Sequence, residues 1–164
     1  MVTTMTSITF GSIMAARRDI AGSAIETPLV PSPYLSSVVG QEVLLKLEIT
    51  QPVGTFKIRG AANAIFDLSA DVAGVTCCST GNHGRGVTFA AAKRGLRAVI
   101  CMSTLVPQTR VDGIKALGAE VRIIGVSQDE AQEECLCLVG DEGPCRDITF
   151  RRPAGHRGAG NNRA

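Results

Sequence analysis

Apolar and polar positions follow a regular pattern from residue 74 onward. Short apolar runs of strand length occur three times, at 74–78, 97–102 and 119–125. The segments that follow these runs have helical spacing, which predicts helices over 84–95, 107–117 and 128–139. Strands that alternate with helices form parallel sheets with right-handed crossovers, and the helices cover both faces. The pattern therefore predicts an α/β fold with a parallel sheet between flanking helices, a three-layer αβα arrangement.

The first 73 residues have a less regular pattern. We expect a loose N-terminus over 1–11 and a helix over 12–24. Prolines predict an extended segment over 26–33, because they restrict the backbone of the residues before them. An apolar run predicts a strand over 42–48, and an Ala-rich segment predicts a helix over 57–68.

Composition and charge narrow the possible classes of function. The chain has 164 residues, which is enough for one domain with a buried core, and its formal net charge is +2. This balance and the absence of Trp give no indication of a nucleic-acid or membrane partner. No apolar run has the length of a membrane span, and the N-terminus has no secretory signal pattern.

The cysteines do not form a metal-binding pattern. Cys77, Cys78 and Cys101 lie in apolar strand patterns, which is typical of inert core thiols. Cys135 and Cys137 have Cys-x-Cys spacing, but no second pair completes a zinc site. We therefore expect no metal, and a reducing, cytoplasmic setting.

One lysine follows a Gly-Thr-Phe turn, in the segment QPVGTFKIRGA at 51–61. A lysine amine is nucleophilic only when neutral, and burial or a nearby cation favours the neutral form. Lys57 has Phe56 before it and Arg59 close by, and cations are disfavoured at the start of a helix. The setting favours a lysine that bonds to an aldehyde, although a solvated lysine in a first helical turn is the simpler alternative.

A glycine-rich segment, STGNHGRG at 79–86, joins the first predicted strand of the regular region to its helix. A turn of this kind at a helix N-terminus presents unpaired N–H groups and the positive end of the helix dipole, so it favours anions. The segment lacks the Lys-Ser/Thr ending of a Walker loop, and its glycines do not have dinucleotide-binding spacing. The residues alone predict a cradle for a phosphate or a carboxylate.

Together the two segments resemble the active-site signatures of the fold-type II pyridoxal-phosphate enzymes. They are most similar to those of the serine/threonine dehydratases (ammonia-lyases), including the dehydratases of hydroxyectoine utilisation. The resemblance implies the N-terminal half of a two-domain fold like that of the tryptophan synthase β chain. Residues 12–73 would then belong to the larger cofactor domain and residues 74–143 to the smaller βα domain. Members of this family are usually homo-oligomers.

The resemblance also assigns roles to residues. Lys57 corresponds to the lysine that carries pyridoxal 5'-phosphate, and Phe56 and Asn82 correspond to residues that contact this cofactor. The loop that holds the substrate carboxylate consists of Ser79, Thr80, Gly81, Asn82 and His83.

Two residues depart from the family pattern. Thr80 stands where dehydratases often have Ala or Ser, and a serine there can act as an acid or base in racemising relatives. Arg85 stands where Gln is common. We interpret His83 as a loop residue packed or hydrogen-bonded beside the cofactor, and not as a metal ligand or general base.

The implied reaction is the β-elimination of serine or threonine to a 2-oxo acid and ammonia. Lys57 would take the α-proton, and Asn82 would orient the cofactor ring. Two alternatives stay open: an inactive truncated fragment of such an enzyme, and another fold-type II reaction such as racemisation or β-replacement. The implied partner is a small amino-acid substrate, with no nucleic acid and no membrane.

Residues 144–164 have no apolar period, which is typical of a disordered tail. Read one nucleotide later, codons for 150–163 permit the string FDDPxVIAGQGTIG, which closely resembles what dehydratases carry at this point. We therefore expect an out-of-frame tail from about residue 143 and a truncated chain. Such a chain would lack the family's phosphate-binding loop, so we expect exposed apolar surface and marginal stability.

Overall fold

The computed structural model describes residues 8–141 and 145–148 and contains a four-stranded parallel sheet. The strand order is β5-β4-β3-β6, and the strands are β3 (Gly74–Cys78), β4 (Arg97–Met102), β5 (Glu120–Ile123) and β6 (Cys145–Asp147). All three pairings are parallel. The predicted α/β fold class is confirmed, and the runs at 74–78 and 97–102 are strands with the predicted bounds.

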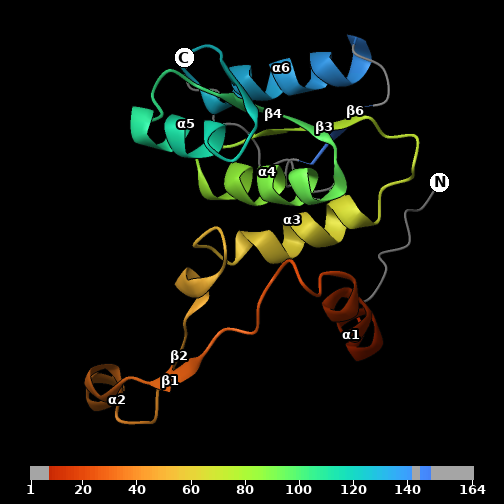
Figure 1. The fold of residues 1–164 in the computed structure, drawn as a ribbon. Helices are drawn as coiled ribbons and strands as arrows, with labels where there is room; N and C mark the ends of the chain where they lie inside the picture. Colours follow the sequence, from red (N-terminus) through yellow and green to blue (C-terminus); the bar gives the residue numbers. More distant parts are fainter. Residues whose placement is uncertain (1–7, 142–144, 149–164) are drawn as a thin grey trace, which may run out of the picture.

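Helices cover the two faces of this sheet (Figure 1). α4 (Asn82–Arg94) and α5 (Gln108–Lys115) pack on one face, and α6 (Gln128–Asp141) packs on the other. Side chains of β4 alternate between the faces: Ile100 joins the α4 side, whereas Cys101 joins the α6 side. α3 (Lys57–Phe66) lies on the outside of α4, and its buried Ala62 and Ile65 extend the same core.

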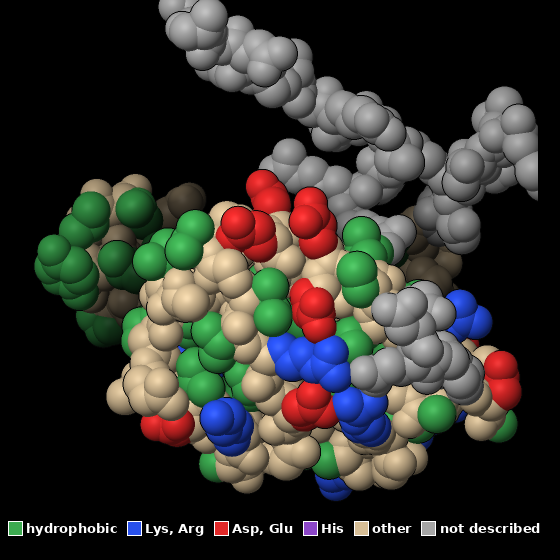
Figure 2. Space-filling model, turned by 90° about the horizontal axis from the view of Figure 1, so that it is seen from above, with side chains coloured by type: hydrophobic (Ala, Val, Ile, Leu, Met, Phe, Trp, Pro, Cys, Tyr) green, Lys and Arg blue, Asp and Glu red, His purple; other side chains and the backbone are tan. Residues whose placement is uncertain are grey.

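The N-terminal segments lie outside this body, and residues 29–46 extend away from it (Figure 1). They are α1 (Phe10–Asp19), β1 (Leu29–Pro31), α2 (Pro33–Val39), β2 (Leu44–Lys46) and the 3₁₀ turn η1 (Glu48–Thr50). β1 and β2 pair antiparallel, and no residue from 29 to 46 is buried. Figure 2 shows hydrophobic side chains gathered on its left, the side where Figure 1 places α2. The expected exposed apolar surface is found here, on residues such as Tyr34 and Val38.

Three sequence expectations need correction. The helix expected over 12–24 is α1, which ends at Asp19, and Gly22 then turns the chain with a φ of 76°. The expected extended segment 26–33 ends in a helix, because Pro33 occupies the first turn of α2 and Ser32 caps it. Cys145–Asp147 form β6, where we expected an irregular tail; residues 149–164, and so most of the expected out-of-frame stretch, lie outside the described residues.

The described part of the chain has no helix that is long and apolar enough to cross a membrane. Cys77, Cys78 and Cys101 are buried free thiols, as expected for core positions. Cys135 is also buried, whereas Cys137 is exposed, so the two do not face a common ligand.

Candidate active site

Lys57 is the first residue of α3. Its backbone N–H donates to Thr55 Oγ1 at 3.3 Å, so the buried Thr55 side chain shapes the turn before the helix. Phe56 precedes the helix, and its ring centroid lies 5.2 Å from Lys57 Nζ. Phe56 is 56% exposed, so its ring shields the Lys57 amine from solvent only in part.

Gly86 fixes how closely α4 approaches Lys57. A Cβ atom at Gly86 would lie 3.2 Å from the carbonyl carbon of Lys57 and from the backbone N of Ile58. The two helices therefore cross at a glycine, with backbone against backbone. This contact sets the position of Lys57 relative to the loop at the N-terminus of α4.

Ser79 organises the loop 79–83. Its buried Oγ accepts hydrogen bonds from the backbone N–H of Gly81 at 3.1 Å and of Gly84 at 2.8 Å. Gly81 has φ 157° and ψ −91°, a backbone conformation that residues with a side chain rarely adopt. The tight turn therefore depends on both the Ser79 hydroxyl and the missing side chain of Gly81.

Lys57 and the loop line the same cavity, which has a volume of about 330 Å³. The predicted residues that line it are Lys57, Ser79, Thr80, Gly81, Asn82 and His83. Segments more than 20 residues apart in the sequence thus meet at the carboxyl end of β3, where parallel sheets place their ligands. Phe56 is not among the lining residues, and its ring lies beside Lys57 Nζ.

The imidazole of His83 is tied to the end of β6. Nε2 lies 2.8 Å from the carbonyl oxygen of Ile148, and since a carbonyl only accepts, Nε2 carries a proton. Burial lowers the pKa of His83 below its usual value, the hydrogen bond to Ile148 opposes this, and the charge of Lys57 lowers it further. His83 therefore lies in the first turn of α4 and is hydrogen-bonded, and its neutral ring leaves Lys57 as the basic group among the lining residues.

Two lining residues, Cys78 and Gln128, were not predicted. The Cys78 thiol donates to the Gln128 carbonyl at 3.3 Å and accepts from the Gln128 side-chain amide at 3.0 Å. Burial raises the pKa of Cys78 to about 11, so the group stays a thiol at neutral pH. This pair links β3 to the start of α6 and closes one side of the cavity.

A partly buried carboxylate network, which sequence reasoning also missed, supports α3. The Arg59 guanidinium donates to both oxygens of Glu48, at 2.8 and 3.0 Å. Thr27 and Gln51 also donate to Glu48, at 2.7 and 3.1 Å. The hydrogen bonds from Arg59, Thr27 and Gln51 lower the pKa of Glu48 to about 2, against the opposing effect of burial. Arg59 sits two residues after Lys57, so the network holds the helix start in place.

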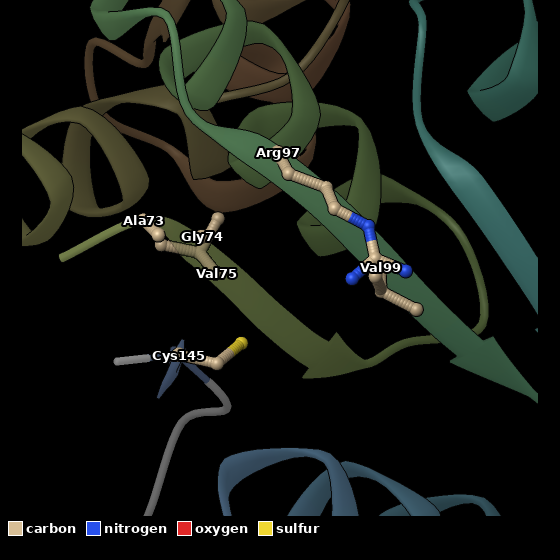
Figure 3. Close-up of a pocket in the computed structure, with 6 residues that line it drawn as sticks. All are labelled: Ala73, Gly74, Val75, Arg97, Val99 and Cys145. Atoms are coloured by element: carbon tan, nitrogen blue, oxygen red, sulfur yellow. The ribbon is translucent and has the colours of Figure 1, made fainter. Parts of the chain in front are cut away.

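Another cavity lies at the opposite, amino end of the strands (Figure 3). Figure 3 shows it between β3, β4 and Cys145, with the Arg97 side chain lying along β4 toward Val99. Its volume is about 50 Å³, and it contains none of the predicted site residues. The cavity that contains the predicted site residues is therefore the one at the carboxyl end of β3.

Residues 20–160 match the protein family described as pyridoxal-phosphate dependent enzyme. The chain belongs to this family. A protein of Sinorhizobium fredii (strain NBRC 101917 / NGR234), provisionally named a threonine dehydratase, is 46% identical over 161 residues, which are 95% of this chain and 48% of that protein. A relative from Thermotoga maritima, named L-threonine ammonia-lyase, is 40% identical over 131 residues, which are 79% of this chain and 33% of that protein.

Solved structures of this enzyme family have the same fold. A T.th. threonine deaminase superimposes with a TM-score of 0.79 at 33% identity, over 89% of this chain and 46% of that chain. A pyridoxal 5'-phosphate-dependent aspartate racemase superimposes with a TM-score of 0.81 at 28% identity, over 90% of this chain and 46% of that chain. The chain spans about half the length of these relatives.

The residues around the cavity fit one part of the family's cofactor, its aldehyde end and its ring. Lys57 supplies an amine, and Asn82 supplies an exposed amide with no hydrogen bond to the described residues. These residues would hold the aldehyde end and the ring of the cofactor.

Proposed function

We propose that Lys57 and the loop 79–83 form the amino-acid-binding side of an active site that converts serine or threonine to a 2-oxo acid and ammonia. The observation that carries this proposal is that the Lys57 amine and the loop line one cavity. Pyridoxal phosphate, when bound, supplies the electron-withdrawing system that stabilises negative charge at the substrate Cα.

Each residue has a separate task in this proposal. Lys57 would hold the cofactor through its amine, and Lys57 Nζ would accept the α-proton of the amino acid. The loop, shaped by Ser79, binds the substrate carboxylate beside the positive end of α4. Asn82 orients the ring, and His83 stays neutral, so that it adds no charge next to Lys57.

Racemisation is a second candidate. The likeness to an aspartate racemase and the Thr80 side chain at the cavity favour it, because a hydroxyl can hold a proton on the second face of Cα. A non-catalytic fragment is the third, since the chain spans about half of its relatives.

One assay separates these candidates. The chain is incubated with pyridoxal phosphate and L-serine or L-threonine, and the 2-oxo acid and the D-amino acid are measured, with Lys57→Arg as control. The proposal predicts 2-oxo acid that is lost in the control. A D-amino acid without 2-oxo acid would favour racemisation, and cofactor binding without either product would favour the fragment.

A further inference from the structure

Three buried thiols lie together between the sheet and α6. Cys78 ends β3, Cys101 is its register partner on β4, and Cys135 of α6 joins them in one buried cluster. Cys101 and Cys135 are both 0% exposed, and their side chains are hydrogen-bonded to each other. We propose that hydrogen peroxide oxidises Cys101 and Cys135 to a reversible disulfide, which fixes α6 to the sheet.

Hydrogen bonds make Cys135 the more reactive thiol of the pair. Its Sγ accepts from Thr76 Oγ1 at 3.4 Å, and the thiol and the backbone N–H of Cys101 also donate to it. The hydrogen bond from the Cys101 thiol favours the thiolate and so lowers the pKa of Cys135, against the opposing effect of burial. The same hydrogen bond, together with burial, raises the pKa of Cys101. Since the thiolate is the nucleophile, Cys135 should react first.

The two thiols can form a disulfide with peroxide as the only co-reactant. The Cys135 thiolate attacks one peroxide oxygen, the O–O bond breaks, and the leaving hydroxide takes up the proton that Cys135 has lost, which gives water and a sulfenic acid. The Cys101 sulfur then attacks the Cys135 sulfur, and the hydroxyl group leaves as water with the Cys101 proton. In total the two thiols lose two electrons and two protons, and one peroxide becomes two waters. Excess thiol reverses the oxidation.

Burial determines which oxidants can reach the pair. Cys78 lines the candidate active-site cavity and lies next to Cys101, so the cavity brings small solutes to the edge of the cluster. Peroxide is small and uncharged, whereas a peptide disulfide is too large to enter while α6 stays packed on the sheet. Burial raises the pKa of Cys78 to about 11, so Cys78 itself is a poor nucleophile at neutral pH.

A disulfide at this place would act on a wall of the candidate active site. Cys135 lies on the same helix as Gln128, which begins α6 and donates a hydrogen bond to Cys78 at the cavity. A cross-link between α6 and β4 closes a loop of the chain and restricts the opening of the helix. Oxidation would therefore stiffen the side of the cavity that Gln128 forms.

Oxidation of the native full chain tests the proposal without pyridoxal phosphate, so its result is independent of the proposed reaction. The reduced chain is treated with hydrogen peroxide, the remaining thiols are alkylated after unfolding, and the peptides are mapped by mass spectrometry. We expect one linked pair, Cys101 with Cys135, about 2 Da lighter than the two separate peptides and split by dithiothreitol. Oxidised glutathione, in a parallel arm, should react at least about tenfold more slowly. In native-state hydrogen exchange, the amides of α6 should exchange at least about tenfold more slowly after oxidation.

Three variants assign the roles. Cys101→Ser treated with peroxide and dimedone, which traps sulfenic acids, should carry the label on Cys135, whereas Cys135→Ser should carry none on Cys101. Cys137→Ser is the matched control, because Cys137 is exposed on the same helix, and this variant should cross-link like the wild type. No cross-link, a different cysteine pair, a dimedone label on Cys101, equal rates with both oxidants, or unchanged exchange of α6 would overturn the proposal.

Discussion

The Ser79 hydroxyl determines the shape of the loop at the candidate site. Ser79 directly follows the last residue of β3. Its hydroxyl accepts hydrogen bonds from the backbone N–H groups of Gly81 and Gly84, which have no acceptor within helix α4. Its side chain is buried, with 4% of the residue exposed, so water cannot replace the lost acceptor freely. A single hydroxyl thus links the loop geometry to the stability of the fold.

Replacing Ser79 by Ala should therefore destabilise the chain. We expect a loss of about 1–3 kcal/mol in the free energy of unfolding, because two buried donors lose their acceptor. Ser37→Ala is a matched control, since the exposed Ser37 hydroxyl only donates to Tyr34 O, and its effect should stay within about 0.5 kcal/mol. Urea unfolding of both variants measures the difference. Equal stabilities would show that Ser79 does not hold the loop.

Glu48 makes stability depend on pH. Hydrogen bonds from Arg59, and then from Thr27 and Gln51, lower its pKa from 4.5 to about 2 in the folded chain, whereas the unfolded chain keeps the ordinary value. The folded state then binds fewer protons, so this contribution is fully present above pH 4.5 and is lost as the pH falls toward about 2.

The variant Glu48→Gln tests this linkage. With allowance for solvent screening at a carboxylate that is 20% exposed, we expect it to be about 2 kcal/mol less stable near neutral pH. The difference should shrink as the pH falls below 4.5. Glu42→Gln, at an exposed position, serves as control. A difference between Glu48→Gln and the wild type that stays constant over this range would contradict the assigned cause.

At the scale of elements, the crossing of α3 and α4 places the lysine. Gly86 lets the backbone of α4 reach the backbone of Lys57, with 3.2 Å between a would-be Cβ and the Lys57 carbonyl. Gly113 is a useful comparison, because it also lies within a helix but has nothing within 4 Å of its would-be Cβ.

The substitutions Gly86→Ala and Gly113→Ala should change the stability of the chain in opposite directions. Alanine stabilises a helix by up to about 1 kcal/mol relative to glycine, so Gly113→Ala should stabilise the chain. At Gly86 the added methyl group forces the helices apart at a cost of about 1–3 kcal/mol, which exceeds that gain. Thermal unfolding measures both. A stabilised Gly86→Ala variant would show that the two helices separate easily there.

Elements with a local signal were predictable from the sequence. β3 and β4 follow from continuous apolar runs, and the glycine-rich turn marks the start of α4. α2 was missed because Pro33 blocks a helix interior but is favourable in a first turn. β6 was missed because its three residues form a strand only by pairing with β3.

The same distinction applies to the site. The residues of loop 79–83 line the same cavity as Lys57. They could be predicted because the loop and the lysine segment are each a motif that can be recognised in the sequence. Glu48 and Gln128 belong to no motif, and their partners are separated from them by 11 and 50 residues. Contacts of this kind depend on the tertiary fold and leave no local signal in the sequence.

At the scale of the whole molecule, the chain divides into a buried body and an exposed N-terminal arm. The body contains β3, β4 and the helices on both faces, with side chains such as Ile100 and Ile114 fully buried. The arm, residues 29–46, has no buried residue and carries exposed Leu and Val side chains. Little apolar burial opposes its local unfolding.

Hydrogen exchange should separate these two parts. We expect amides paired between β1 and β2 to exchange through local opening, at a free energy well below that of global unfolding. Amides paired between β3 and β4 should exchange only with global unfolding. Native-state exchange with mass spectrometry measures both. Equal protection of the arm and the body would show that the arm unfolds only together with the body.

We propose above all that Lys57 is the residue that carries pyridoxal phosphate. The direct measurement is to incubate the chain with pyridoxal phosphate, reduce it with borohydride, and locate the added mass by peptide mapping. We expect the label on Lys57 and its loss in Lys57→Arg, although Lys46, Lys93 and Lys115 are also present. A label spread over those three lysines, or one that is unchanged in Lys57→Arg, would contradict the claim.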